Sequence, residues 1–206
     1  MEATTYGKKY ELVLYDKIED KGRTLYRIRA LKNFADVRAG DLGGYIESEE
    51  NLSQEGNCWV YLCAKAYGNA QVYDNAKVHE YAQVFGFAQV YDNAKVYGKA
   101  QVYDNAKVYG KAQVYGNAQV YDNAQVYDKV KVYDNAQVYE YAQVYGKCYA
   151  QVYGNAQVFG VAKVYDSAKV YGDAQVYGYS QASSHVRVAG KAKVADAIIK
   201  YVSLIE

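Results

Sequence analysis

The chain has 206 residues, with 24 Lys and Arg against 23 Asp and Glu and a net charge of +1. This balance argues against a dedicated nucleic-acid binder, which would carry a surplus of basic residues. No apolar run in the sequence reaches the roughly 18 residues that a membrane-spanning helix needs, so we expect no membrane partner. The 27 Tyr residues and the absence of Pro indicate an unusual, repetitive architecture.

Residues 1–57 show no repeat. Residues 10–15 and 24–30 are rich in β-branched and aromatic side chains and predict two strands, with a hairpin turn at 19–23 between them. The first residues lack the apolar core of a signal peptide, so we expect a cytoplasmic protein. We interpret residues 1–57 as a cap over an exposed strand edge. A separate recognition role for this segment is the alternative.

Residues 58–197 consist of 23 hexapeptides of the form Ala-x-Val-Tyr-(Gly/Asp)-x. The first position is Ala in 19 units, the third is Val in 21 and the fourth is aromatic in 19. One slip interrupts the period, where Cys148 and Tyr149 are inserted. Side chains alternate between the two sides of a strand, so Ala and Val face one way while Gln or Lys and Tyr face the other. A period of six does not match a helix, and each unit predicts one short strand with Ala and Val inward.

Such short strands can bury a core only when successive coils stack, so the sequence predicts an all-β, parallel β-solenoid. Three hexapeptides per coil would give a triangular prism, and two would give a thin, two-sided coil. A full reversal within two residues would require positive φ and would select Gly or Asn in every copy. The corner pairs 80–81, 128–129 and 140–141 contain other residues. We therefore favour the triangular coil, with about seven to eight turns spaced by about 4.8 Å, and keep the two-sided coil as the alternative.

The repeat decays toward the C-terminus. Ser183, Ala189 and Ala195 replace the aromatic residue of the fourth position. The last dozen residues predict either a short amphipathic helix or a final strand. We interpret residues 198–206 as a C-terminal cap in either case.

The motif Ala-x-Val-x-Gly-Asn resembles the hexapeptide repeat of left-handed parallel β-helices. Many bacterial acyltransferases, usually trimers, share that fold. Residues 25–31 (Leu-Tyr-Arg-Ile-Arg-Ala-Leu), 41–46 and 51–61 are similar to a group of bacterial and prophage hexapeptide-repeat proteins that carry transferase names without a demonstrated reaction. The resemblance implies a left-handed solenoid and an acyl-CoA-dependent acyltransferase as a candidate activity. Tyr after Val departs from the acyltransferases, where Gly is common, so the resemblance is specific for fold and weak for function.

Two histidines are candidates for catalysis, because acyltransferases of this fold use a His as general base between subunits. His79 occupies an aromatic position of the repeat and His185 lies at a corner. A general base needs an orienting partner and a substrate within hydrogen-bond reach. The sequence shows no convergent pocket and no projecting loop apart from the inserted Cys148 and Tyr149. We therefore expect both histidines to be structural, keep His79 as the catalytic candidate, and expect no cofactor and no metal site.

The other reactive side chains also favour structural roles. Cys58 and Cys148 occupy or adjoin inward positions, so we expect them to pack in the core. Together with Cys63 they form a scattered set that suits neither a disulfide framework nor a zinc site. The acidic residues of the fifth position recur along the whole array, which is typical of solvated corners and not of one desolvated catalytic pair.

The tyrosines of the fourth position form the most unusual pattern. In a triangular coil they would stack about 4.8 Å apart along up to three edges. Such stacking would stabilise neighbouring coils by about 0.2–1 kcal/mol per pair. Tyr also suits interfaces, because it combines an apolar ring with a hydroxyl group.

We therefore predict a non-enzymatic scaffold or binding module that presents tyrosine ladders to a protein or a glycan. The alternatives are the acyltransferase and a self-assembling structural protein, as a trimer or joined end to end. The predicted ligand-contacting residues are Tyr91, Tyr97, Tyr103, Tyr109, Tyr115, Tyr121, Tyr127 and Tyr133.

Overall fold

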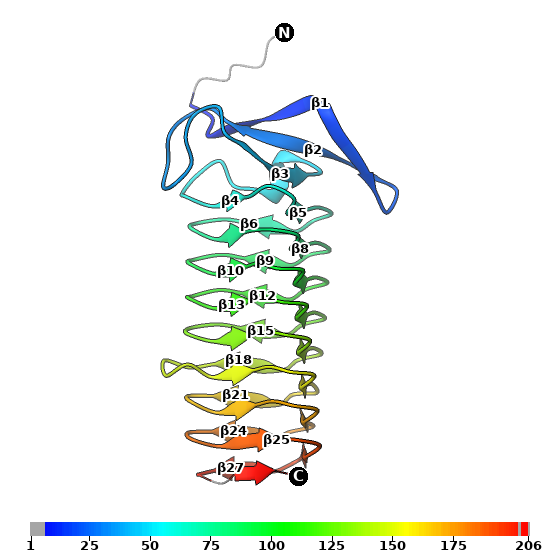
Figure 1. Ribbon diagram of the computed structural model, residues 1–206, viewed down its shortest axis with the longest axis vertical. Helices are drawn as coiled ribbons and strands as arrows, with labels where there is room; N and C mark the ends of the chain where they lie inside the picture. Colours follow the sequence, from blue (N-terminus) through cyan, green and yellow to red (C-terminus); the bar gives the residue numbers. More distant parts are fainter. Residues whose placement is uncertain (1–6, 202, 206) are drawn as a thin grey trace.

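The computed structural model describes residues 7–201 and 203–205, which form a rod of stacked coils beneath a β-hairpin (Figure 1). Most short strands pair in parallel with the strand 18 residues later, as Gln101 does with Gln119, and the interval is 20 residues across the insertion, as between Gln137 and Gln157. Three sheets run along the rod, so the coil is triangular as predicted. Residues 1–6, 202 and 206 lie outside the described residues. The prediction of a missing signal peptide concerns the first of these, and the two predicted caps include all of them.

Sheet I connects the N-terminal hairpin to one face of the solenoid. Its first three strands pair antiparallel, and the third starts the parallel ladder by pairing with β5. In order, its strands are β1 (Tyr10–Asp20), β2 (Arg23–Ala30), β3 (Leu42–Ile46), β5 (Lys65–Ala66), β8 (Gln83–Val84), β11 (Gln101–Val102), β14 (Gln119–Val120), β17 (Gln137–Val138), β20 (Gln157–Val158), β23 (Gln175–Tyr177) and β26 (Lys193–Ala195).

Sheets II and III form the other two faces. Sheet II contains β4 (Trp59–Val60), β7 (Lys77–Val78), β10 (Lys95–Val96), β13 (Gln113–Val114), β16 (Lys131–Val132), β19 (Gln151–Val152), β22 (Lys169–Val170), β25 (Arg187–Ala189) and β28 (Ser203–Ile205). Sheet III contains β6 (Gln71–Val72), β9 (Gln89–Val90), β12 (Lys107–Val108), β15 (Gln125–Val126), β18 (Gln143–Tyr145), β21 (Lys163–Tyr165), β24 (Gln181–Ser183) and β27 (Ile198–Lys200).

The rod has about nine turns, since sheet II contains nine strands. This exceeds the predicted number because strands without the consensus also join the ladder: β3 at the start, and β27 and β28 at the end. The C-terminal segment thus forms strands and not a helix. The division into a cap, an array and a second cap stays a prediction.

The interior of the rod consists of the first and third positions of the repeat. Ala112 and Val114, for example, are fully buried, as are their equivalents in the neighbouring coils. Burial of a Val side chain contributes about 1.5–3 kcal/mol, so the same small contribution recurs in every coil. In the part of the chain that the structure describes, the only helical element is the 3-10 turn η1 (Glu49–Asn51), and no helix there could cross a bilayer.

The corners correct one argument made from the sequence. Asp128, Glu80 and Glu140, which were expected to exclude positive φ, have φ values of 63°, 57° and 58°. The triangular coil is confirmed, but its corners also need a left-handed residue. Asp tolerates this conformation because its short side chain can bond nearby backbone, and the Asp92 carboxylate accepts a hydrogen bond from Gly110 N one coil later, at 3.1 Å.

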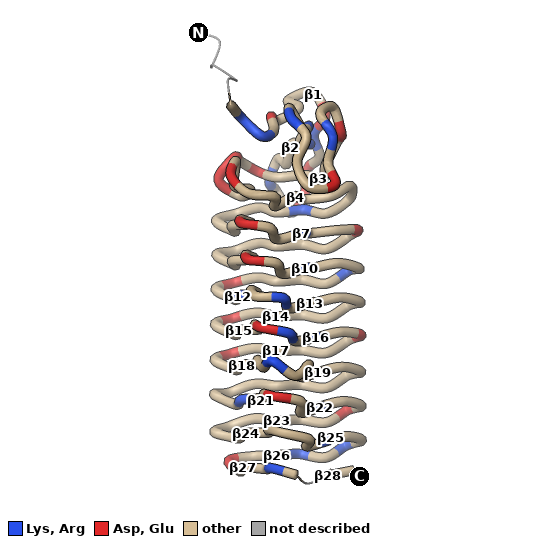
Figure 2. The backbone as a smooth tube through the Cα atoms, turned by 90° about the vertical axis from the view of Figure 1, so that its left-hand side faces the viewer, with Lys and Arg blue, Asp and Glu red and all other residues tan. Residues whose placement is uncertain are grey.

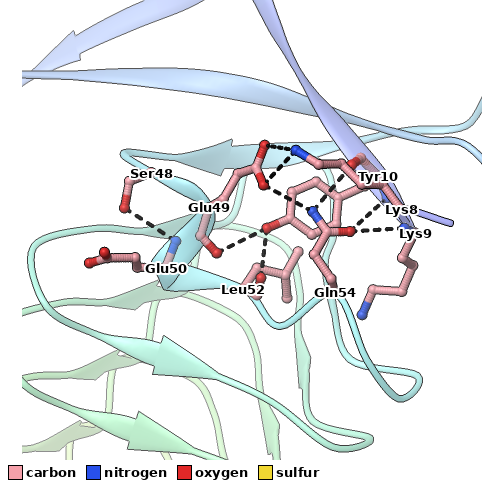
Figure 3. A network of polar contacts seen from close by, with 8 residues as sticks. All are labelled: Lys8, Lys9, Tyr10, Ser48, Glu49, Glu50, Leu52 and Gln54. Carbon is pink, nitrogen blue, oxygen red and sulfur yellow. Dashed lines mark hydrogen bonds and ion pairs between the residues drawn. The ribbon is translucent and has the colours of Figure 1, made fainter. Parts of the chain in front are cut away.

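The N-terminal segment is anchored to the first coil by a buried phenol (Figure 3). The Tyr10 hydroxyl donates to the carbonyl oxygens of Leu52 at 2.6 Å and Glu49 at 3.2 Å. Lys8 forms an ion pair with the Glu49 carboxylate at 2.7 Å, and the Gln54 amide donates to the Tyr10 carbonyl at 3.3 Å. These contacts fix the start of β1 against the top of the solenoid.

Candidate functional site

The aromatic residues of the fourth position form three ladders, one along each sheet. Ladder I contains Tyr67, Phe85, Tyr103, Tyr121, Tyr139, Phe159 and Tyr177. Ladder II follows sheet II through Tyr61, His79, Tyr97, Tyr115, Tyr133, Tyr153 and Tyr171. Ladder III contains Tyr73, Tyr91, Tyr109, Tyr127, Tyr145 and Tyr165.

The eight tyrosines predicted to contact a ligand are therefore divided among three faces. Two of them lie in ladder I, three in ladder II and three in ladder III. The period of six alone could not assign them to faces, because that assignment depends on the number of hexapeptides per coil. A single ligand could contact at most one or two of these groups.

Within a ladder the rings lie flat on one another. The ring centroids of Tyr103 and Tyr121 are 4.9 Å apart with planes 2° from parallel, and Tyr121 stacks in the same way on Tyr139. Both faces of the Tyr121 ring are thus covered by neighbours. A sugar, which stacks on a ring face, would have to compete with these contacts. What the ladder offers to a partner is a row of ring edges and hydroxyl groups.

Burial shifts the ionisation of several of these hydroxyl groups to higher pH. It raises the pKa of Tyr109 and Tyr133 to about 12, with neighbouring tyrosines in the same ladder adding to the effect. The pKa of Tyr121 is raised for the same reasons. At neutral pH each of these phenols is therefore a neutral hydrogen-bond donor and acceptor.

The upper ends of ladders I and II are already occupied by charged side chains from the N-terminal segment. From the tip of the β1–β2 hairpin, which projects beside the first coils (Figure 1), Lys21 Nζ lies 4.7 Å from the Phe85 ring centroid and 3.4 Å from the Tyr67 hydroxyl. From the loop before β3, the Asp36 carboxylate accepts the Tyr61 hydroxyl at 2.8 Å. The ladders thus bind two segments of their own chain.

A groove of about 850 Å³ lies between this loop and the first coils of sheet II. The repeat pattern does not predict this groove, because its walls come from the non-repeating loop and from separate coils of the array. His79 is part of its lining. The other lining residues are Asp36, Val37, Gly40, Asp41, Leu42, Trp59, Tyr61, Leu62, Glu80, Lys95 and Tyr97.

His79 stacks on Tyr61, with ring centroids 3.8 Å apart. Burial lowers the pKa of His79 below its usual value of 6.5, and Lys77 adds to the effect. The imidazole is therefore neutral at pH 7, as a general base must be. Asp36 is held instead by Lys77 and Tyr61, and the hydrogen bond from Lys77 lowers the pKa of Asp36 to about 2. His185 lies exposed between β24 and β25, so the structure does not bring the two histidines together.

The cysteines do not form a site. Cys58 is fully buried, as expected, and Lys9 Nζ lies 3.1 Å from its sulfur. Burial raises the pKa of the Cys58 thiol. The prediction that Cys148 packs in the core is wrong, because the two inserted residues bulge outward at the corner between β18 and β19 and leave Cys148 exposed. Cys63 is also exposed.

Comparison with known proteins agrees with this geometry. Residues 100–116 and 112–128, in the middle of the array, match the family model "YdcK Beta solenoid repeat". The chain is also 51% identical over 41 residues to the "Uncharacterized acetyltransferase YdcK" of Escherichia coli (strain K12). That match covers 20% of the present chain and 13% of the relative's length.

The array fits the hexapeptide-repeat β-solenoid family. The matching residues include the centres of all three ladders, so this likeness concerns the repeat itself. The groove around His79 and the N-terminal segment lie outside the residues matched by the family model. The comparisons thus relate the present hexapeptide-repeat β-solenoid to a protein with an acetyltransferase name, without locating a reaction on it.

Proposed function

We propose that the chain is a non-enzymatic binding scaffold whose ladders dock extended protein segments rich in Lys and Asp. The observation that carries this proposal is the docking of its own N-terminal segment. Lys21 binds ladder I beside the Phe85 ring and at the Tyr67 hydroxyl group, and Asp36 binds ladder II through the Tyr61 hydroxyl. Tyrosine hydroxyl groups recur further along both ladders, from Tyr103 in ladder I and from Tyr97 in ladder II, so a partner could use the same chemistry.

The geometry of the ladders favours a protein over a glycan as partner. Inner rings such as Tyr121 have both faces covered, which leaves hydroxyl groups and ring edges for recognition. Lys and Asp side chains hydrogen-bond to hydroxyl groups, and aromatic edges pack well against peptide. Each single contact is weak, and the repetition of one site along a rigid rod would supply affinity through several contacts at once.

Peptide display against the intact protein tests this proposal. Selected Lys- and Asp-rich peptides would be measured by calorimetry against the wild type and against a triple variant of ladder I, Tyr103→Ala, Tyr121→Ala and Tyr139→Ala. We expect affinity to fall about tenfold or more for peptides that use this face.

Two further variants control for folding and for the identity of the face. Changing the same three residues to Phe retains the stack, as Phe85 and Phe159 do naturally, and removes only the hydroxyl groups. We expect this variant to weaken binding with an unchanged circular dichroism spectrum. The equivalent Ala changes in ladder III should leave the same peptides bound. If no selected peptide responds to any ladder, the proposal is wrong.

Acyl transfer from an acyl-CoA at the groove is the second candidate. It is favoured by the neutral His79 in the groove's lining and by the name of the Escherichia coli relative. It ranks second because the nearby Asp36 carboxylate is engaged by Lys77 and Tyr61 and does not orient the imidazole. Release of free thiol from acetyl-CoA that is lost in a His79→Ala variant would establish this activity in place of the scaffold.

A further inference from the structure

A column of lysines occupies the edge between sheets III and II. Lys111, Lys129 and Lys147 follow one another on three successive coils, at the corners after β12, β15 and β18 (Figure 2). Backbone hydrogen bonds fix this alignment: Lys111 N donates to Asp128 O at 2.9 Å, and Lys129 N donates to Gly146 O at 3.1 Å. Successive coils are about 4.8 Å apart, so the column places three positive charges close together on an edge that also carries Asp92, Asp128 and Asp166.

A hollow of about 270 Å³ opens beside this column. Three lysines contribute to its lining, and none of the lining residues is acidic. Each ion pair found among residues 7–201 and 203–205 includes a residue of the N-terminal segment, so none of them neutralises these lysines. The lining residues are Lys111, Gln113, Lys129, Val130, Lys131 and Tyr149.

The single interruption of the repeat supplies the aromatic wall of this hollow. Tyr149 belongs to the inserted pair, is 55% exposed and has a φ of 66°. Its ring centroid lies 5.6 Å from Lys129 Nζ. The insertion therefore places a phenol beside the stacked lysines, outside the three ladders.

A neighbouring hollow limits where an anion could bind. It shares Lys111, Lys129 and Lys147 but is also lined by Asp92 and Asp128. The carboxylates would repel an anion there, whereas the hollow beside Tyr149 combines three ammonium groups with the neutral donors Gln113 and Tyr149.

We propose that the hollow beside Tyr149 binds the phosphate group of a small anionic ligand, a phosphate ester or a diphosphate. A multivalent oxyanion would relieve the repulsion between the stacked lysines, and Lys binds phosphate as a compact point charge. The ring of Tyr149 offers a surface to the organic part of an ester. This site is independent of the ladders and of the scaffold function.

Calorimetric titration with inorganic pyrophosphate and with orthophosphate tests the site on the intact protein. We expect saturable 1:1 binding of pyrophosphate, weaker binding of orthophosphate, and affinities that fall as salt is added. The double variant Lys129→Gln and Lys131→Gln should weaken pyrophosphate binding by about tenfold or more. The matched control is Lys169→Gln with Lys191→Gln, which removes the same charge further down the rod and should bind as the wild type does.

A second probe separates the role of Tyr149 from that of the lysines. Tyr149→Ala should weaken the binding of phenyl phosphate more than that of pyrophosphate, because only the former can contact the ring. The site is overturned if pyrophosphate binding does not saturate, or if both double variants lose the same affinity. Binding of heparin in the absence of pyrophosphate binding would also overturn it, in favour of a diffuse charged surface.

Discussion

The N-terminal segment and the repeat array are stabilised in opposite ways. The N-terminal segment is held by unlike partners, such as Arg27 with Asp16 and Lys65 with Asp20, at 2.6 Å in both pairs. The array is held by like partners: Val on Val, Tyr on Tyr, and Gln on Gln, as where Gln157 donates to Gln137 at 3.1 Å.

The two kinds of contact have different roles: like contacts stabilise the coils, and the contacts that occur once fix their register. Identical neighbours stabilise every coil equally, but they would also accept a shifted coil or a second copy of the chain. The contacts of the N-terminal segment occur once, so they define where the array starts. Trp59 is fully buried against Tyr10 and Phe34. Its contacts also occur only once, although it lies in the first hexapeptide.

Removal of residues 1–40 should have the largest effect. A chain that begins at Asp41 keeps β3 but exposes its edge, which β2 covers in the intact protein. We expect end-to-end assembly into high-mass species, measured by light scattering coupled to size exclusion. A monodisperse truncated chain would show that β1 and β2 do not act as a cap.

High pH should have the second-largest effect, because it should unfold the array. Folding raises the pKa of Tyr73, Tyr109 and Tyr133 to about 12. Stability is thus complete below pH 10, where both states are protonated, and declines as pH rises toward 12 because the unfolded chain ionises first. Tyrosinate absorbance and circular dichroism should change together in one steep transition. Ionisation of the ladders without loss of β-structure would contradict this coupling.

Single core substitutions in the array should lower the free energy of unfolding by equal, intermediate amounts. Val102→Ala, Val120→Ala and Val138→Ala each remove the same buried methyl groups from sheet I. We expect each to lower the free energy of unfolding by about 2 kcal/mol, measured by urea denaturation. Values that differ between coils by more than about 1 kcal/mol would contradict the equivalence of the coils.

Asp36→Asn should have the smallest effect, confined to the N-terminal segment. The pKa of Asp36 is about 2, well below its ordinary 3.8, so its stabilisation is present above pH 3.8 and is lost as pH falls toward 2. Because the Asp36 side chain is 55% exposed and screened by solvent, we expect a loss of about 1 kcal/mol at pH 7. The variant and the wild type should become equal near pH 2. A difference that persists there would show that the carboxylate charge is not its source.

The features that recur in every repeat could be predicted from the sequence, whereas features that occur once in the structure could not. The inward Ala and Val, the parallel pairing and the ring spacing follow from a six-residue alternation and are confirmed. The groove at His79 could not be found, because it depends on a loop whose position is set by Asp36, Tyr61 and Lys77 in three dimensions. Cys148 was misplaced because an insertion can either enter a core or leave it, and alternation cannot distinguish the two.

The 18-residue coil also sets a unit of length for the molecule. Deletion of residues 100–117 would join Lys99 to Ala118 and leave each sheet, ladder and corner on its original side of the rod. Loss of a single hexapeptide would preserve the core pattern equally well, yet it would turn everything downstream by a third of a revolution relative to the N-terminal hairpin. The rod can therefore lengthen or shorten without changing its faces only in whole coils.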